Sequence, residues 1–188
     1  MAAATEHGFS EEPLPQAVVL DADFVVNVLH EREEFHKDCT AFASKLFDEN
    51  VPIVYTQLLR LEFMSGWQKA VTRGGIPANM LRDLNVSDPG DDLVRLYKLG
   101  DEYLSVFLSL YGRYEVRLGT RLQDQARRYM AEYNLKPMDA CLVASAHRTG
   151  IHDLASLDAD FRRVDWLHLW NDRIPARRKA ARRRRART

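Results

Sequence analysis

The stretch Val18-Val19-Leu20-Asp21-Ala22-Asp23 decides the fold of this 188-residue chain, because it joins a buried strand to the start of a helix. Residues 17–20 form a short, uninterrupted apolar run, which is typical of a central strand covered on both faces. Asp21 follows at once and has the chemistry of a helix cap. The sequence therefore predicts a parallel strand over residues 17–20 with an acidic side chain at its carboxyl end.

Strand-like and helix-like segments alternate along the rest of the chain. Short apolar runs predict further strands at residues 52–55, 154–157 and 166–169. Apolar residues at spacings of three and four predict helices at residues 24–31, 33–50, 57–71, 122–133 and 140–147. Strands that alternate with helices are typical of a parallel sheet covered on both faces. The sequence therefore predicts an α/β protein, a three-layer α/β/α fold around a central, mostly parallel sheet.

One domain with two appendages is expected from the length and the local composition. Residues 1–15 are polar and interrupted by prolines, which predicts a flexible N-terminal segment. Residues 16–172 are predicted to form the globular domain, in which residues 74–118 are a helical insertion. Residues 173–188 are predicted to be a disordered basic tail.

The predicted insertion contains one strong helix signal. Asp88-Pro89 places a capping acid before a proline at the first helical position. Apolar side chains then recur along one face of the helix, at Leu93, Leu96, Tyr97, Leu104, Phe107, Leu108 and Tyr111. We interpret this stripe as core packing or as the contact face of a homodimer.

The composition excludes several classes of protein. The two cysteines, Cys39 and Cys141, form no CxxC pair, and the N-terminal residues lack the apolar core of a signal peptide. No run approaches the ~18 apolar residues that are needed to span a bilayer. The histidines lack zinc-site spacing, and no GxSxG, Walker A or GxGxxG motif occurs. We therefore expect a cytoplasmic protein with no membrane partner.

Acidic residues stand beside apolar segments at distant positions in the chain. Asp21 ends the first predicted strand, and Asp158 follows the third. Asp139 opens a helix, and Glu62 lies within a leucine-rich helix. Acids are seldom buried without a counter-charge, and the carboxyl ends of parallel strands meet at one edge of a sheet. The predicted fold therefore brings close together acids that lie far apart in the sequence.

The natural counter-charge for such a cluster is a divalent metal ion. Mg²⁺ and Mn²⁺ are hard cations that favour oxygen ligands. The hydroxyl residues Thr56 and Ser156 follow strands at the same edge, where they are expected to support the acids. Without metal the carboxylates repel one another, so at least one acid is expected to hold its proton to unusually high pH.

Four short motifs, each containing one or more of these acids, follow one another along the chain. They are Val18-Val19-Leu20-Asp21-Ala22-Asp23, the segment from Thr56 through Glu62 to Gly66, Met138-Asp139-Ala140-Cys141-Leu142-Val143-Ala144-Ser145-Ala146, and Ser156-Leu157-Asp158-Ala159-Asp160-Phe161. Together they resemble the PIN domain (PilT N-terminal domain) nucleases, in particular the VapC-type toxins. The resemblance covers about residues 17–170.

The resemblance implies a PIN-like fold and a divalent-metal-dependent endoribonuclease that uses Mg²⁺ or Mn²⁺. The acids that match the catalytic, metal-binding positions of the family are Asp21, Glu62, Asp139 and Asp158. Asp160 would be a further metal ligand or would support the site, and Ser156 stands where the family more often has threonine. A VapC-type protein would be the toxin of a type II toxin–antitoxin pair. Its partner would be a VapB-like antitoxin, which could insert a basic side chain among the acids.

Other functions are open at this point. A housekeeping PIN nuclease would process RNA without an antitoxin. Leu20-Asp21-Ala22-Asp23 also resembles the nucleophile motif of haloacid-dehalogenase-like phosphatases, but the later acidic segment Gly90-Asp91-Asp92 lacks a preceding strand. Taken singly, Asp21 and Asp139 are more often helix caps, and Asp158 and Asp160 could be ordinary turn residues, whereas Glu62 on its leucine-rich helix is harder to explain in this way. If all of them were structural, the protein would be a non-catalytic nucleic-acid-binding module.

The formal net charge is zero but unevenly distributed. Residues 176–188 carry no acid and eight basic residues, namely Arg177, Arg178, Lys179, Arg182, Arg183, Arg184, Arg185 and Arg187. Removing these eight from the 27 basic residues leaves 19 against 27 acidic ones, a formal charge of −8. Such a tail favours contacts with RNA phosphates, which raise affinity without selecting a sequence. The tail could equally bind the acidic body or a protein partner.

Overall fold

The computed structural model describes residues 3–75 and 93–172 of the chain. The strands are β1 (Thr5–His7), β2 (Val18–Leu20), β3 (Ile53–Thr56), β4 (Arg113–Val116), β5 (Asp153–Ala155) and β6 (His168–Trp170). They form one six-stranded sheet in the order β1-β6-β5-β2-β3-β4, and every neighbouring pair is parallel. The mostly parallel sheet expected from the sequence is confirmed.

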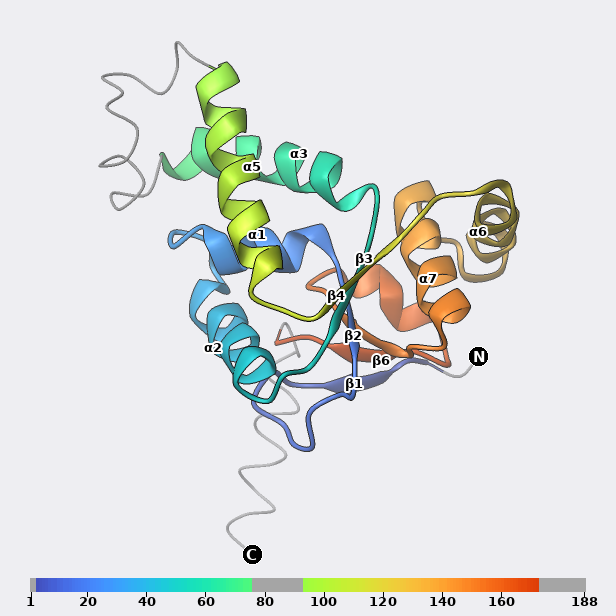
Figure 1. Ribbon diagram of the computed structural model, residues 1–188. Helices are drawn as coiled ribbons and strands as arrows, with labels where there is room; N and C mark the ends of the chain where they lie inside the picture. The colour runs from blue at the N-terminus through green and yellow to red at the C-terminus, as the bar shows by residue number, and fades with distance from the viewer. Residues whose placement is uncertain (1–2, 76–92, 173–188) are drawn as a thin grey trace, which may run out of the picture.

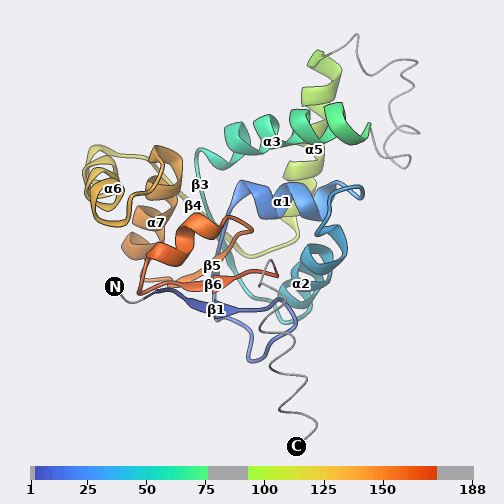
Figure 2. The same ribbon diagram turned by 180° about the vertical axis from the view of Figure 1, so that it is seen from behind.

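Helices cover both faces of the sheet. One face carries α1 (Ala22–Leu29), α2 (His36–Asp48), α3 (Leu59–Gly74) and α5 (Leu93–Ser109), as Figure 1 shows. The other carries α6 (Thr120–Tyr133), α7 (Pro137–Thr149) and the 3-10 helix η1 (Ala159–Arg163), seen from behind in Figure 2. The predicted three-layer α/β/α architecture is therefore confirmed.

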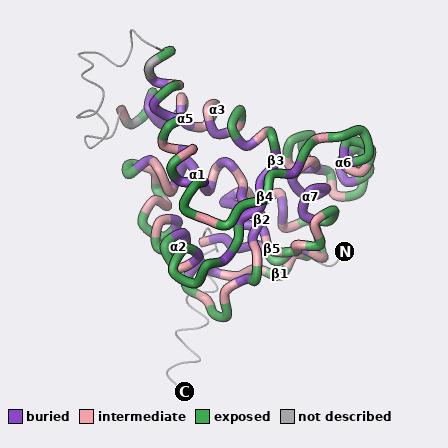
Figure 3. The backbone as a smooth tube through the Cα atoms, viewed as in Figure 1, coloured by how far each residue is buried: buried purple, intermediate pink, exposed green. Residues whose placement is uncertain are grey.

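The central strands supply two hydrophobic cores, one on each face of the sheet. Val18 and Leu20 pack into the core beneath α1, α2, α3 and α5, whereas Val19 packs into the core beneath α6 and α7. In β3, Ile53 and Val54 divide between the two cores in the same way. This division follows from the two-residue period of a strand. Figure 3 shows the buried strands between the more exposed helices.

β2 lies where the direction of the chain across the sheet reverses. β3 pairs with one side of β2 and continues to β4, whereas β5 pairs with the other side and continues to β6 and β1. In open α/β sheets, ligands bind beyond the carboxyl ends of the strands at such a reversal. The residues after β2 and β5, beginning with Asp21 and Ser156, therefore occupy the position expected of a functional site.

The edge strand β1 differs from the sequence-based expectation of a flexible segment over residues 1–15. β1 pairs with β6 and extends the sheet. Glu6 forms an ion pair with Arg162 at 2.9 Å, and the ring of His7 stacks on Trp170 with centroids 4.8 Å apart. These contacts with distant residues hold a strand that is polar in sequence.

The second edge strand, β4, lies within residues 74–118, which were expected to be a helical insertion. α5 is helical as expected, but β4 pairs with β3 and ends at the buried Val116. Residues 113–116 are therefore a strand rather than part of a helix. The predicted helix start at Asp88-Pro89 lies outside the described residues, as does the basic tail from residue 173 onward.

The apolar stripe of α5 serves the core of the protein. Leu96, Leu104, Phe107 and Leu108 are buried against the same core as α1 and α3. The hydroxyl of Tyr111 donates a hydrogen bond to the carbonyl of Ala43 at 2.9 Å. Core packing is thus confirmed for these residues, and the homodimer remains a prediction.

Within residues 3–75 and 93–172, no helix has the length and apolar character needed to cross a membrane.

Candidate active site

Asp21 occupies the junction between β2 and α1. Its Oδ1 accepts a hydrogen bond from the backbone N–H of Ala22 at 2.6 Å, so it caps α1 as expected. Its Oδ2 accepts a hydrogen bond from the hydroxyl of Ser156, which follows β5, also at 2.6 Å. Ser156 is fully buried and its Oγ accepts the backbone N–H of Asp158 at 3.0 Å. Ser156 therefore ties the end of β2 to the segment after β5.

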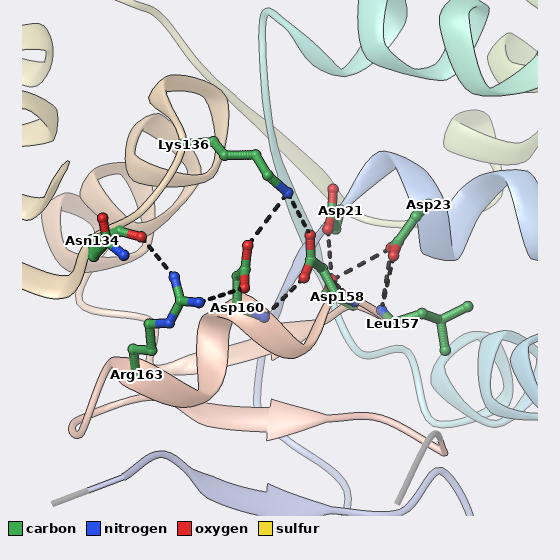
Figure 4. Close-up of polar contacts among 9 residues, drawn as sticks. Asp21, Asp23, Asn134, Lys136, Leu157, Asp158, Asp160 and Arg163 are labelled. Atoms are coloured by element: carbon green, nitrogen blue, oxygen red, sulfur yellow. Dashed lines mark hydrogen bonds and ion pairs between the residues drawn. The ribbon is translucent and has the colours of Figure 1, made fainter.

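Asp23 is a second acid at this junction, and the sequence analysis did not select it as a site residue. Its carboxylate accepts the backbone N–H of Leu157, with the nitrogen 3.1 Å and 3.2 Å from its two oxygens. It also lies 3.4 Å from the hydroxyl of Ser156. Figure 4 shows Asp21 and Asp23 facing Leu157 and Asp158. Two carboxylates thus meet the loop after β5 from the start of α1.

Glu62 and Asp139 approach the same place from two other helices. Glu62 lies in the first turn of α3, and Asp139 in the first turn of α7. A cleft of about 410 Å³ opens at the carboxyl edge of the sheet. Within the described part of the chain, six acids line it, namely Asp21, Asp23, Glu33, Glu62, Asp139 and Asp158, and of these Glu33 forms an ion pair with Arg73. The predicted gathering of Asp21, Glu62, Asp139 and Asp158 is thus what the structure shows.

Burial, followed by the charges of neighbouring carboxylates, raises the pKa of several acids in the cleft. Burial, followed by the charges of Asp21 and Asp139, raises the pKa of Glu62 to about 7. Burial is also the largest cause that raises the pKa of Asp23 to about 6. The pKa of Asp21 lies well above its usual value, because of burial and then the charge of Asp23. The pKa values are raised in the direction expected from the sequence, but burial, rather than repulsion between the carboxylates, is the largest cause of each shift.

A divalent cation fits the chemistry of this cleft. Carboxylate oxygens of Asp139, Asp158 and Asp160 lie within 4.8 Å of one another. Oδ2 of Asp139 is buried and has no hydrogen-bond partner among the described residues. A buried carboxylate oxygen without a partner is costly, and a hard cation would satisfy it. The residues present therefore match the donor set that Mg²⁺ or Mn²⁺ would need.

A lysine that the sequence analysis did not select lies at the outer rim. Nζ of Lys136 is 3.5 Å from Oδ2 of Asp158 and 3.3 Å from Oδ2 of Asp160 (Figure 4). The charge of Asp158, followed by a hydrogen bond to Asp160, raises the pKa of Lys136. Arg163 forms an ion pair with Asp160 at 2.9 Å. Part of the acidic charge is therefore already balanced by basic side chains of this chain.

Three predicted site residues lie beside the cleft rather than in its lining, namely Thr56, Ser156 and Asp160. Oγ1 of Thr56 accepts the backbone N–H of Leu58 at 3.2 Å, so Thr56 fixes the entry into α3. Asp160 is held at the rim by Lys136 and Arg163. Thr56 thus positions the helix that carries Glu62, and Asp160, although outside the lining, has a carboxylate oxygen close to those of Asp139 and Asp158.

Comparison with known protein families agrees with the topology and the acidic cleft. The sequence matches the PIN domain model over residues 18–167. The chain belongs to the PIN domain family. The match spans all four acids that the sequence analysis selected, from Asp21 to Asp158, and argues against the haloacid-dehalogenase-like alternative. No curated protein matched the sequence.

Three solved structures illustrate the similarity of fold. VapC20 from Mycobacterium tuberculosis, a toxin that cleaves the sarcin-ricin loop, has a TM-score of 0.52 and 16% identity, covering 77% of this chain and 92% of its own. A toxin–antitoxin complex from Klebsiella pneumoniae has a TM-score of 0.50 and 14% identity, covering 80% and 95%. PAE2754 from Pyrobaculum aerophilum has a TM-score of 0.52 and 14% identity, covering 87% and 90%. At these identities the likeness is one of fold.

Proposed function

We propose that this PIN domain is a divalent-metal-dependent endoribonuclease, the toxin of a type II toxin–antitoxin pair. One observation carries the proposal: carboxylates from separate segments of the chain converge on one cleft at the carboxyl edge of the sheet. Acids this close are costly to assemble unless a cation is to be bound. The family match supports nuclease chemistry at this position.

In the proposed site, the metal ligands are Asp21, Glu62, Asp139 and Asp158, and Asp160 contributes at the rim. A bound Mg²⁺ or Mn²⁺ would supply an activated water and neutralise charge on the scissile phosphate. Ser156 holds one oxygen of Asp21 and leaves the carboxylate in a fixed orientation. Asp23 ties α1 to the loop after β5, which keeps the ligands in place before substrate binds.

The similar structures are the support for proposing RNA as the substrate and an antitoxin as the partner. VapC20 cleaves an RNA loop, and one similar structure is a toxin–antitoxin complex. A VapB-like partner would silence the site by placing a basic side chain among the acids, where Lys136 already forms ion pairs at the rim. Native co-purification with a small protein partner would support this assignment, whereas a protein that is fully active and alone under native conditions would favour a housekeeping nuclease.

The test of the nuclease function uses purified protein, total RNA and Mg²⁺, with the cut ends mapped by sequencing. Asp139→Asn is the matched control, because it removes one charge with almost no change of shape. We expect cuts that need Mg²⁺, vanish with a chelator and are lost in Asp139→Asn, while both proteins melt cooperatively. Metal-dependent cutting that survives in Asp139→Asn would contradict the proposal, and RNA binding without any cutting would favour a binding module.

A further inference from the structure

The face of α3 that borders the cleft changes from acidic to basic along its length. Glu62, Ser65, Gly66, Lys69 and Arg73 all line the cleft. Their spacings of three and four residues place them along one face of the helix. The cleft therefore continues from Glu62 to Lys69 and Arg73, where the one acid among the described lining residues is Glu33, the ion-pair partner of Arg73.

The middle of this helix face carries no large side chain. Between Glu62 and Lys69 it presents only the small residues Ser65 and Gly66. A Cβ added at Gly66 would lie 2.9 Å from Cγ2 of Val26 in α1, so the two helices are in close contact there. A larger residue at this position would separate α1 from α3. Ser65, Gly66 and Val26 all line the cleft between its acidic and its basic end.

Lys69 is the available cation at the far end. It is exposed, and no other described residue forms an ion pair with it. The neighbouring Arg73 is engaged, because its Nη2 lies 3.2 Å from Oε1 of Glu33. Nε of Arg73 also donates a hydrogen bond to the backbone carbonyl of Lys69 at 3.2 Å. Arg73 is thus fixed at the end of the cleft, and of these two cations only Lys69 lacks an acidic partner within residues 3–75 and 93–172.

We propose that Lys69 binds a backbone phosphate of single-stranded RNA, separate from the phosphate that the acids hold. The proposal rests on the nuclease function and adds the direction in which the strand leaves the acids. Lys69 lies seven positions after Glu62, about 10 Å along the helix axis at 1.5 Å per residue, so the two side chains leave the helix about two turns apart. The cleft has the size of a small-ligand pocket, which suits one extended strand rather than a duplex.

The binding test compares Lys69→Gln with Lys37→Gln, both in an Asp139→Asn background with Mg²⁺. Lys37 is an exposed lysine of α2 that does not line the cleft, so it controls for the loss of one positive charge. The probe is a single-stranded RNA oligonucleotide, and affinity is measured over a range of salt. We expect Lys69→Gln to bind about three- to tenfold more weakly and to lower the salt slope by about 0.7. Lys37→Gln should match the parent, and Lys69→Arg should retain the slope.

The kinetic test uses protein with the acids intact and oligonucleotides lengthened on one side of the cut at a time. The KM of the wild type should fall when the added nucleotides reach Lys69. In Lys69→Gln the same lengthening should leave KM unchanged, and kcat should stay constant in both proteins. Equal salt slopes for Lys69→Gln and Lys37→Gln would overturn the phosphate subsite, even if RNA is cleaved normally. A slope change at Lys69 in a protein that cuts no RNA would support the subsite and refute the nuclease function.

Discussion

The hydroxyl of Ser156 donates a hydrogen bond to Oδ2 of Asp21 at 2.6 Å, across 135 positions of sequence. The same hydroxyl oxygen accepts the backbone N–H of Asp158 at 3.0 Å. Both groups are at a buried junction, so removing the hydroxyl would leave a donor and an acceptor without partners. Ser156 thus sets the relative placement of two proposed metal ligands without being one itself.

Ser156→Ala is predicted to lower the rate of metal-dependent RNA cleavage by about 10- to 100-fold, the usual cost of losing a group that orients a metal ligand. Ser156→Thr keeps the hydroxyl and should retain most of the activity. Single-turnover cleavage at saturating Mg²⁺ measures both, with urea unfolding to confirm that the variants fold. Equal rates for alanine and threonine would show that the hydroxyl has no part in positioning Asp21.

The metal-free protein is predicted to lose stability as the pH rises toward neutrality. The pKa of Glu62 is about 7 in the folded protein against 4.5 for the free side chain, so the folded state binds the proton more tightly than the unfolded state. The contribution of Glu62 is therefore fully present below pH 4.5 and is lost as the pH rises through about 7. Asp23, with a folded pKa of about 6, acts in the same direction.

Urea unfolding in a chelator, from about pH 5 to about pH 8, measures this effect. The free energy of unfolding should fall more steeply with pH in the wild type than in Glu62→Gln, which has no proton to lose. Added Mg²⁺ should restore the free energy of unfolding that is lost near neutral pH, because the ion replaces the protons as counter-charge. Parallel profiles for wild type and Glu62→Gln would mean that Glu62 titrates normally.

Lys136→Gln is predicted to strengthen metal binding. The ammonium group competes with a cation for Asp158 and Asp160, from which it lies 3.5 Å and 3.3 Å away. Exposed ion pairs are weak, so the gain in Mn²⁺ affinity should be modest, about two- to fivefold. Isothermal titration calorimetry measures it, with Lys98→Gln on α5 as the matched control. Weaker binding in Lys136→Gln would instead indicate that the lysine helps to organise the acids.

Deletion of residues 176–188 is predicted to reduce the salt dependence of RNA binding. On a single strand, each basic residue that no longer binds a phosphate lowers the slope by about 0.7, so the decrease shows how many residues of the tail bind RNA. The positions of the cuts should not move, because binding to phosphates carries no sequence information. An unchanged slope would assign the tail to the acidic body or to a protein partner.

The sequence was sufficient to predict the central part of this fold. β2 is an uninterrupted apolar run that ends in Asp21, and the parallel topology then places Asp21, Asp139 and Asp158 at one edge. The edge strands were missed because their stability comes from partners far along the chain. β1 reads Thr5-Glu6-His7, and its main supports are Arg162 and Trp170, which no local pattern reveals.

The same limit explains the site residues that were missed. Asp23 lies in the first turn of α1, where an acid is favourable at any helix, so its sequence position carries no sign of a further role. Its role appears only through Leu157, 134 positions away, whose backbone N–H it accepts. Lys136 precedes Pro137 and reads as an ordinary surface lysine until η1 brings Asp158 and Asp160 beside it.

The spread of the acids along the chain has a consequence for protein synthesis. Asp21 and Glu62 leave the ribosome early, but Ser156 and Asp158 follow β5 and emerge only after β1 to β4 and the helices between them. A nascent chain that lacks β5 has neither the hydroxyl that orients Asp21 nor the acid that completes the cleft. On the proposed function, a nascent chain therefore gains activity only once β5 has joined β2 in the sheet.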